Sequence, residues 1–400
     1  MKMQLKTIND FSLKNETVLV RVDFNVPIKD GKIQDTTRID ETIKTISTLI
    51  DKSCKIVLMS HLGNPKGTVN QAYTLKPIAD YLQSIVKTKV HFAPDCIGEK
   101  TKTLIENSQP KEMILLENLR FHQEEETPSS DLSFAKELAS LASYYINDAF
   151  GTAHRQHSST YYICEFFKQK VMIGLLMEKE IDALKNLLDH PKKPFLALLG
   201  GAKIESKIKV IESLLKKVDT LLIGGAMAIP FLIAQGHPLY HPLVTSESIE
   251  LAKNILKAQK VELHLPLDFV VAEENNPSYP SKISSIHDPI QKPTYPADIG
   301  PLTIESFKKK LKGTRTIFWN GPMGLFELHP YEKGTLEIAK IIGTTKAYSV
   351  VGGGDSVAAI QKLGLQKNFS HLSTGGGASL EYIELGTLCG LQAIEKASQA

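Results

Sequence analysis

Cysteine and tryptophan are scarce in this chain of 400 residues, which holds four cysteines and one tryptophan. The cysteines lie far apart and show no metal-ligand spacing: Cys54, Cys96, Cys164 and Cys389. This pattern disfavours both a disulfide-rich fold and a cysteine zinc site, and it favours a reducing compartment such as the cytoplasm.

The chain also lacks a charge excess and a long apolar run. Its net charge of +3 argues against binding nucleic acid or membranes through bulk charge, although a local basic patch is compatible with it. The polar N-terminus does not resemble a signal peptide. The longest uncharged stretch, residues 220–246, is interrupted by Gly224, Gly225, Pro230 and Gly236. We therefore expect a cytoplasmic protein with small-molecule partners, no nucleic acid and no membrane.

Several common catalytic motifs are missing. No GxxxxGK[ST] phosphate loop occurs, and no GxGxxG is followed by a fitting acidic residue. The protein-kinase motifs and the GxSxG elbow are absent too. The histidines show no HExxH spacing. These absences argue against P-loop enzymes, protein kinases, serine hydrolases and zinc proteases, and they leave a dinucleotide fold weakly supported.

Short apolar runs, such as the strand candidates at 195–199 and 316–319, alternate with helical patterns almost throughout the chain. The length predicts two domains. Because the strands are almost wholly apolar, we expect parallel sheets buried on both faces by helices, in two Rossmann-like α/β domains. The domains are predicted to span residues 1–175, completed by a C-terminal helix at 386–400, and residues 176–385. A helical run at 178–188 is the candidate hinge helix. The Pro-rich and Ser-rich segment 275–301 is expected to form a long loop.

In the first half, polar and cationic residues follow the predicted strands, in the segments RVDFNVP (21–27), SHLGNP (60–65), ENLRFH (117–122) and NDAFGTAHR (147–155). Ligands bind beyond the carboxyl ends of the strands in open parallel sheets. Arginine recognises phosphate and carboxylate bidentately. Any one of these side chains alone is explained by a solvated loop or an ion pair, but their recurrence predicts a site for a small anion.

In the second half, glycines follow the strands instead, in the segments LLGGAK (198–203), LIGGAM (222–227), WNGPMG (319–324), VVGGGDS (350–356) and STGGGAS (373–379). Glycine lets backbone N–H groups approach a phosphate, and a helix N-terminus adds partial positive charge. Asp355 or Ser356 is a candidate N-cap for a helix beginning near Val357. A single strand–glycine–helix turn is only a tight connection, but five of them predict a polyphosphate site.

Taken together, these segments resemble the phosphoglycerate kinase family along the whole chain. The family resemblance implies a monomeric glycolytic enzyme with two domains and a hinge. The first domain would bind 3-phosphoglycerate or 1,3-bisphosphoglycerate, and the second would bind ADP or ATP with Mg²⁺. The resemblance assigns substrate binding to Asp23, Phe24, Asn25, Arg38, His61, Leu62, Gly63, Asn64, Arg120 and Arg155.

For the nucleotide, the resemblance assigns Lys203, Lys207, Gly300, Asn320, Glu327, Gly353, Gly354, Asp355 and Ser356, with Asp355 also approaching the magnesium. The catalytic set it implies is Arg38, Lys203 and Gly376. The acceptor carboxylate is already ionised at neutral pH, so no general base is required. Catalysis must then come from positioning and from cancelling negative charge when the domains close.

Two positions depart from the family pattern. Asn64 replaces the arginine of HLGRP, so a charged phosphate ligand is lost there, and Ala226 stands where a third glycine is usual. Three alternatives stay open: a kinase for another carboxylate such as acetate or aspartate, a catalytically impaired homologue, and a nicotinamide dehydrogenase. The arginines favour a phosphorylated acid over a plain one.

Overall fold

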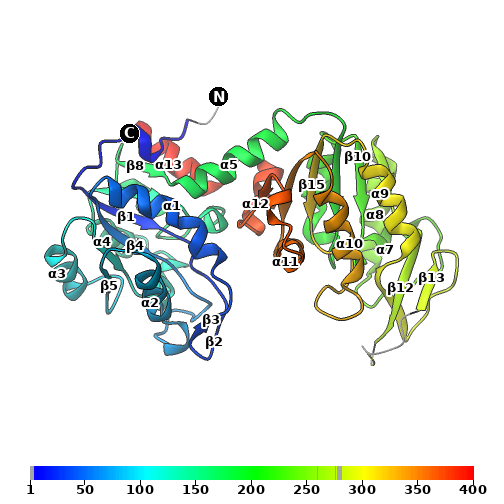
Figure 1. The fold of residues 1–400 in the computed structure, drawn as a ribbon, viewed down its shortest axis with the longest axis horizontal. Coiled ribbons are helices and arrows are strands. Elements are labelled where there is room, and N and C mark those ends of the chain that lie inside the picture. The colour runs from blue at the N-terminus through cyan, green and yellow to red at the C-terminus, as the bar shows by residue number, and fades with distance from the viewer. Residues whose placement is uncertain (1–3, 259, 275, 277–281) are drawn as a thin grey trace. The chain divides into compact units, whose positions relative to one another are not determined.

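A computed structural model describes residues 4–258, 260–274, 276 and 282–400. The chain divides into two compact units, Met1–Asp182 with Thr387–Ala400 (unit 1) and Ala183–Gly386 (unit 2). It passes from unit 1 into unit 2 within the helix α5 (Leu175–Leu188), as Figure 1 shows. Each unit holds a parallel sheet flanked by helices, which confirms the predicted fold class.

The sheet of unit 1 has six parallel strands in the described residues, in the order β5-β6-β4-β1-β7-β8. Their bounds are β1 (Thr17–Arg21), β4 (Lys55–Met59), β5 (Val90–Phe92), β6 (Met113–Leu115), β7 (Tyr144–Asn147) and β8 (Val171–Ile173). A small hairpin joins β2 (Ile28–Lys29) to β3 (Lys32–Ile33). The central strands are buried on both faces, as their continuous apolar sequence requires.

Amphipathic helices cover this sheet and complete the core of unit 1 (Figure 1). They are α1 (Thr37–Asp51), α2 (Lys76–Ile85), α3 (Glu99–Asn107), α4 (Ser133–Ala139), the first part of α5, and α13 (Cys389–Gln399). The last helix packs against β8 through Leu391 and Ile394, both fully buried. The C-terminal residues thus belong to the compact unit formed by the N-terminal part of the chain.

The main sheet of unit 2 is also parallel, in the order β11-β10-β9-β15-β16-β17. Its strands are β9 (Phe195–Leu199), β10 (Thr220–Ile223), β11 (Glu262–His264), β15 (Thr316–Asn320), β16 (Tyr348–Gly352) and β17 (His371–Leu372). The chain leaves β9 toward β10 and later returns to its other side with β15. The strand order therefore reverses between β9 and β15, which creates the crevice where such sheets bind ligands.

The helices of unit 2 are α6 (Ile208–Leu215), α7 (Ile229–Ala234), α8 (Ser246–Ala258), α9 (Pro301–Leu311), α10 (Lys333–Gly343), α11 (Gly354–Lys362) and α12 (Gly377–Leu385). They pack around a core that includes the single tryptophan, Trp319, which is fully buried in β15. Among the described residues of the whole chain, none of the helices combines the length and apolar character needed to cross a bilayer.

The expected long loop at 275–301 is wrong for its described part. Unit 2 has a second, antiparallel sheet of β12 (Asp268–Glu273), β13 (Lys282–Ser285) and β14 (Thr294–Ile299). Pro296 made a strand improbable because proline cannot donate to a ladder. In the structure Pro296 pairs with Val271 next to a register shift, where a proline is tolerated. Residues 275 and 277–281 of that expectation lie outside the described residues.

A buried carboxylate holds the first turn of α5. Asp148 Oδ1 accepts hydrogen bonds from the backbone N–H groups of Leu176, at 2.9 Å, and Met177, at 3.0 Å. The Thr45 hydroxyl accepts the N–H of Leu175. Burial raises the pKa of Asp148 to about 7, against the hydrogen bonds from Thr45 and the two N–H groups. Asp148 Oδ2 has no hydrogen-bond partner in the described residues, so it is the oxygen available to carry a proton.

This carboxylate makes the stability of unit 1 depend on pH. Because the pKa of Asp148 is higher in the folded protein than in the unfolded chain, the folded state keeps a proton that the unfolded chain loses above pH ~4. Stability should therefore fall as pH rises from about 4 to about 7, by at most about 1.4 kcal/mol per pH unit.

The substitution Asp148→Asn keeps the oxygen that accepts the two hydrogen bonds and removes the titratable group. Hydrogen exchange of the α5 amides, corrected for the intrinsic rate, should show a flatter pH dependence in this variant. An unchanged pH dependence would exclude Asp148.

Candidate functional site

In unit 1, the candidate substrate residues gather at the carboxyl edge of the sheet. Asp23 follows β1, His61 follows β4, Arg120 follows β6 and Arg155 follows β7, while Arg38 lies in the first turn of α1. Neighbouring parallel strands end at the same edge, so residues distant in sequence reach one region. The arginines lie near enough to one buried histidine to lower its pKa.

That histidine is His61, which is buried at the end of β4. Burial and the positive charges of four arginines hold its pKa well below the usual range; these are Arg21, Arg120, Arg38 and Arg155. The imidazole is therefore neutral at physiological pH, and its Nδ1 lies 3.2 Å from the Arg21 guanidinium. The four guanidinium groups form a local positive field suited to an anion.

Carboxylates balance only part of this charge. Arg38 pairs with Asp23 at 2.8 Å, and Arg120 pairs with Glu126 at 2.8 Å. Among the described residues, no carboxylate pairs with the exposed guanidinium of Arg155, and Arg120 Nε is buried without a hydrogen-bond partner. An incoming anion would supply the missing partners.

Hydrogen bonds from the loop after β4 connect several predicted residues. The Gly63 N–H donates to Asn25 Oδ1 at 2.9 Å, and the Gly63 carbonyl accepts from Arg120 at 2.7 Å. Asn64, next in the chain, is exposed. The loop therefore fixes Asn25 and Arg120 relative to each other and leaves the Asn64 amide facing solvent.

Two of the predicted substrate residues have their side chains in the hydrophobic core. Phe24 is fully buried, and Leu62 is 3% exposed. Their apolar side chains anchor the loops that carry Asp23, Asn25 and His61. Phe24 and Leu62 therefore position these loops, and the polar residues beside them are the ones that could contact a ligand.

Arg21 and its partners form a buried group that was not predicted from the sequence. Arg21 is 1% exposed; its Nε donates to the Ser159 hydroxyl at 2.8 Å, and its guanidinium lies 4.0 Å from Glu125. Glu125 also accepts from the Ser159 hydroxyl at 2.6 Å. The sequence did contain a signal for Arg21, because it is a charged residue at the end of the apolar strand β1. Glu125 lies within three consecutive glutamates, and nothing in the sequence distinguishes it from its neighbours.

In unit 2, Lys207 lies at the point where the strand order reverses. Its ammonium donates to the Gly200 carbonyl after β9 and to Asn320 Oδ1 at the end of β15, both at 2.7 Å. Burial lowers the pKa of Lys207 to about 8, against the opposing effect of Asp355. Lys207 therefore joins the two strands that border the crevice.

Lys203 has a different environment. It is exposed, and its ammonium has no hydrogen bond or ion pair among the described residues. It lies in the segment between β9 and α6, four residues before Lys207. Of these two predicted phosphate ligands, Lys203 is the one with a free charge.

The helix α11 begins beside this crevice, at Gly354. Its N-cap is Gly353, whose φ of 91° favours glycine, and no side chain caps the helix. The prediction that Asp355 or Ser356 is the N-cap is therefore wrong. The Ser356 hydroxyl instead accepts the Gly321 N–H at 2.9 Å. Similarly, Gly376 is the N-cap of α12, without a side-chain cap.

Two acidic residues lie close together near the start of α11. Burial and the nearby Glu327 raise the pKa of Asp355, and Lys207 opposes this shift. Glu327 is exposed. No hydrogen bond or ion pair of the described residues engages the Asp355 carboxylate, which leaves it available to a cation.

Gly300 precedes α9, and its backbone lies against the buried carboxylate of Asp268. A side chain at this position would overlap that carboxylate. Asp268 in turn accepts the N–H groups of Leu302, at 3.0 Å, and Thr303, at 2.8 Å. The glycine is thus required for capping of α9, whether or not a nucleotide approaches it.

Guanidinium groups at one sheet edge and glycine-linked helix N-termini at another define an α/β phosphotransferase that handles anionic substrates. The phosphoglycerate kinase family model matches residues 8–385. Relatives named phosphoglycerate kinase from Pseudothermotoga lettingae and Chlamydia pneumoniae are each 46% identical. They cover 98% of this chain and 99% of their own lengths. The chain belongs to the phosphoglycerate kinase family, whose members are glycolytic kinases acting on the carboxyl group of 3-phosphoglycerate.

Solved structures agree with this assignment. A phosphoglycerate kinase structure from Coxiella burnetii has a TM-score of 0.83 at 32% identity and covers 99% of this chain and 100% of its own. One from Pyrococcus horikoshii has a TM-score of 0.85 at 32% identity, with 98% and 99% covered.

The contrast between the two lysines predicts different effects of the same substitution. Lys207→Gln should weaken nucleotide binding and also destabilise unit 2 by about 2 kcal/mol, because two buried acceptors lose a charged donor. Lys203→Gln should weaken nucleotide binding without changing stability. Denaturant unfolding followed by fluorescence of Trp319, the only tryptophan, reports on unit 2 alone. Equal stability losses would contradict the distinction.

Proposed function

We propose that this chain reversibly transfers a phosphoryl group between 1,3-bisphosphoglycerate and Mg-ADP, giving 3-phosphoglycerate and ATP. The observation that carries the proposal is the arginine cluster around His61, in a chain that matches phosphoglycerate kinases over almost its entire length. A phosphorylated acid carries two anionic ends, and a plain carboxylate would not require so many guanidinium groups.

In this proposal, unit 1 binds the phosphoglycerate. Arg120, Arg155 and His61 surround its anionic groups, and Asn25 orients it by hydrogen bonding, together with Asp23 and the loop of Gly63 and Asn64. Arg38 serves the transferring phosphoryl group. It is suited to that task because its side chain is 36% exposed and Asp23 holds it in place from one side only.

Unit 2 then binds the nucleotide. Its phosphates are held by Lys203 and by the backbone N–H groups at the starts of α11 and α12, among them the N–H groups of Gly354 and Gly376. Lys207 and Asn320 shape the crevice, and Ser356 fixes the Gly321 turn. Glu327 contacts the ribose, with Gly300 nearby. The uncapped start of α11 supports this assignment because such N–H groups bind phosphate oxygens.

Mg²⁺ fits this site. Asp355 offers one half-buried carboxylate without a competing partner in the described residues, and magnesium in kinases is held by one or two carboxylates plus the phosphates. The ion would neutralise charge on the phosphates when bound. Asp355 contributes the fixed protein ligand, and the surrounding amides orient the phosphates.

The transfer requires positioning and charge cancellation, because the attacking carboxylate is already ionised. Arg38 from unit 1 and Lys203 from unit 2 would each cancel negative charge on the transferring group. Neither unit alone holds both cations, so we propose that closure about α5 assembles the site and excludes water. The cytoplasmic location and the monomeric state remain predictions.

A coupled assay tests the proposed function directly. The assay contains the purified protein, 3-phosphoglycerate, Mg-ATP and a glyceraldehyde-phosphate dehydrogenase reporter, and it should show oxidation of NADH. If acetate or aspartate replaces 3-phosphoglycerate, the kinase should not consume ATP. The second candidate is an impaired homologue that only binds these ligands, and Asn64 favours it. Ligand binding without turnover would support that candidate.

Arg38→Ala should reduce kcat by about 10³-fold or more with a much smaller change in KM, because its charge matters most at the transition state. Steady-state kinetics with both substrates measure the change. The exposed Lys29→Ala in the same unit is the control for a lost charge. Turnover close to that of the unmodified enzyme would remove Arg38 from the chemical step.

Asn64→Arg should lower the KM for 3-phosphoglycerate by about tenfold. A charge-assisted hydrogen bond is worth roughly 1.5–3 kcal/mol against about 1 for a neutral one, and about 1.4 kcal/mol corresponds to tenfold. Asn64 is exposed, so the larger side chain is accommodated. Asn64→Gln is the matched uncharged control. If the arginine leaves KM unchanged, a neighbour such as Lys66 already compensates.

A further inference from the structure

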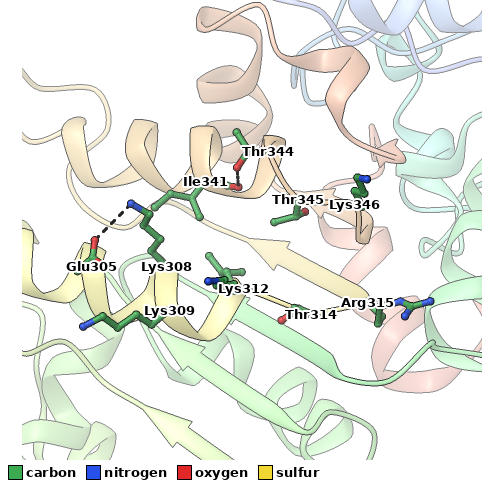
Figure 2. A pocket seen from close by; sticks show the side chains of 12 residues that line it. Glu305, Lys308, Lys309, Lys312, Thr314, Arg315, Ile341, Thr344, Thr345 and Lys346 are labelled. Atoms are coloured by element: carbon green, nitrogen blue, oxygen red, sulfur yellow. Dashed lines mark hydrogen bonds and ion pairs between the residues drawn. The ribbon is translucent and has the colours of Figure 1, made fainter.

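A second concentration of positive charge lies in unit 2, at the opposite edge of its sheet. A hollow of about 900 Å³ is bordered by the C-terminal ends of α9 and α10 and by the loops that lead into β15 and β16 (Figure 2). Its charged lining residues are Glu305, Lys308, Lys309, Lys312, Arg315 and Lys346. Five cations therefore surround one cavity together with a single carboxylate.

These cations are largely unpaired. Glu305 lies 3.7 Å from Lys308, and both side chains are more than half exposed, so this pair is weak. The other four basic side chains make no ion pair or hydrogen bond with any described residue. Figure 2 shows Lys312 and Arg315 in the connection from α9 to β15, and Lys346 in the connection from α10 to β16. Like charges held near one another repel, and a bound anion would relieve that repulsion.

Helix ends do not account for the cluster. Lysines near a helix C-terminus complement its partial negative charge, but two such ends amount to about one unit charge. The terminal carbonyls already accept from other groups: Thr314 donates to the Lys310 carbonyl, and Thr344 to that of Ile341. Arg315 and Lys346 lie beyond the helices. Net positive charge therefore remains after the helix ends are counted.

The loop at Arg315 is fixed by its backbone. The Arg315 N–H donates to the Pro194 carbonyl at 3.0 Å, and its carbonyl accepts from Tyr348 at 2.9 Å. Arg315 immediately precedes β15, whereas Asn320 ends it. Five residues of strand correspond to roughly 16 Å, so the hollow and the candidate nucleotide crevice lie at opposite ends of the same strand.

We propose that this hollow binds a compact polyphosphorylated anion, at a site separate from the candidate nucleotide crevice. Its volume is in the range of small-molecule sites. Arginine and lysine are the side chains that bind phosphate groups, as a fork and as point charges. None of the described residues that line the hollow is aromatic. Bases would therefore have no stacking platform, and a nucleic acid is the less suitable ligand.

Calorimetric titration with inorganic tripolyphosphate tests the site in the intact protein. Saturating ADP and 3-phosphoglycerate, without Mg²⁺ and at low ionic strength, block the candidate active site. One equivalent of tripolyphosphate should still bind. The double variant Lys312→Gln/Arg315→Gln should weaken this binding by at least about tenfold, because two charged contacts are lost. Raising the salt concentration should weaken it further in the unmodified protein.

The matched control is Lys257→Gln/Lys282→Gln, which removes two exposed charges of unit 2 that do not line the hollow. It should change the dissociation constant by less than about twofold, and both double variants should keep the kcat of the unmodified enzyme. Absence of tripolyphosphate binding under blocked conditions would overturn the proposal, as would equal losses of binding in the two variants.

Titration with a duplex DNA oligonucleotide tests the alternative that this patch binds nucleic acid. If the pocket variant weakens DNA binding but not tripolyphosphate binding, the patch is a nucleic-acid contact and the proposal is wrong.

Discussion

This molecule must hold several positive charges close together although they repel one another, and the rest of the structure depends on this constraint. In unit 1, four arginines lie near the buried His61, and their mutual repulsion must be offset by the protein itself. Glu125, Glu126 and Asp23 supply part of the offset, and Ser159 holds Arg21 in one orientation. The same positive field keeps nearby histidines neutral: burial and three of these arginines, together with His154, lower the pKa of His157 to about 3. A phosphorylated substrate would complete the charge balance.

The parallel sheet explains why such clusters form at particular edges. Strands that run the same way end together, so one short polar segment after each strand is enough to build a site. In unit 1 these segments carry guanidinium groups, and in unit 2 they carry glycines, backbone amides and Lys207. The amino edge of the sheet in unit 2 is normally occupied by helix ends and connections. Helix ends there account for some of the positive charge, but not for Arg315 and Lys346, which belong to no helix.

Much of this architecture could be predicted from the sequence, because its main strands are continuous apolar runs. The predicted strand at 195–199 is β9 to the residue, and the one at 316–319 is β15 without Asn320. The second sheet was missed because the segment is rich in proline and serine. Pro296 is tolerated there because β14 is an edge strand and a register shift lies beside this residue. The start of α11 was placed too late because Gly353 takes the N-cap position that a serine or aspartate usually occupies. Such errors arise where tertiary pairing or backbone geometry overrides local preference.

The candidate site was harder to predict than the fold, because residue type alone does not distinguish a ligand from a structural contact. Lys203 and Lys207 lie four residues apart in one segment and carry the same chemical group. Only burial separates them: Lys207 already donates to Gly200 and Asn320, whereas Lys203 is exposed to solvent. The same holds for Phe24 and Asn25, of which one enters the core and the other remains at the edge of the sheet. A motif therefore identifies the segment that forms a site, and the three-dimensional packing decides which of its side chains are free to bind.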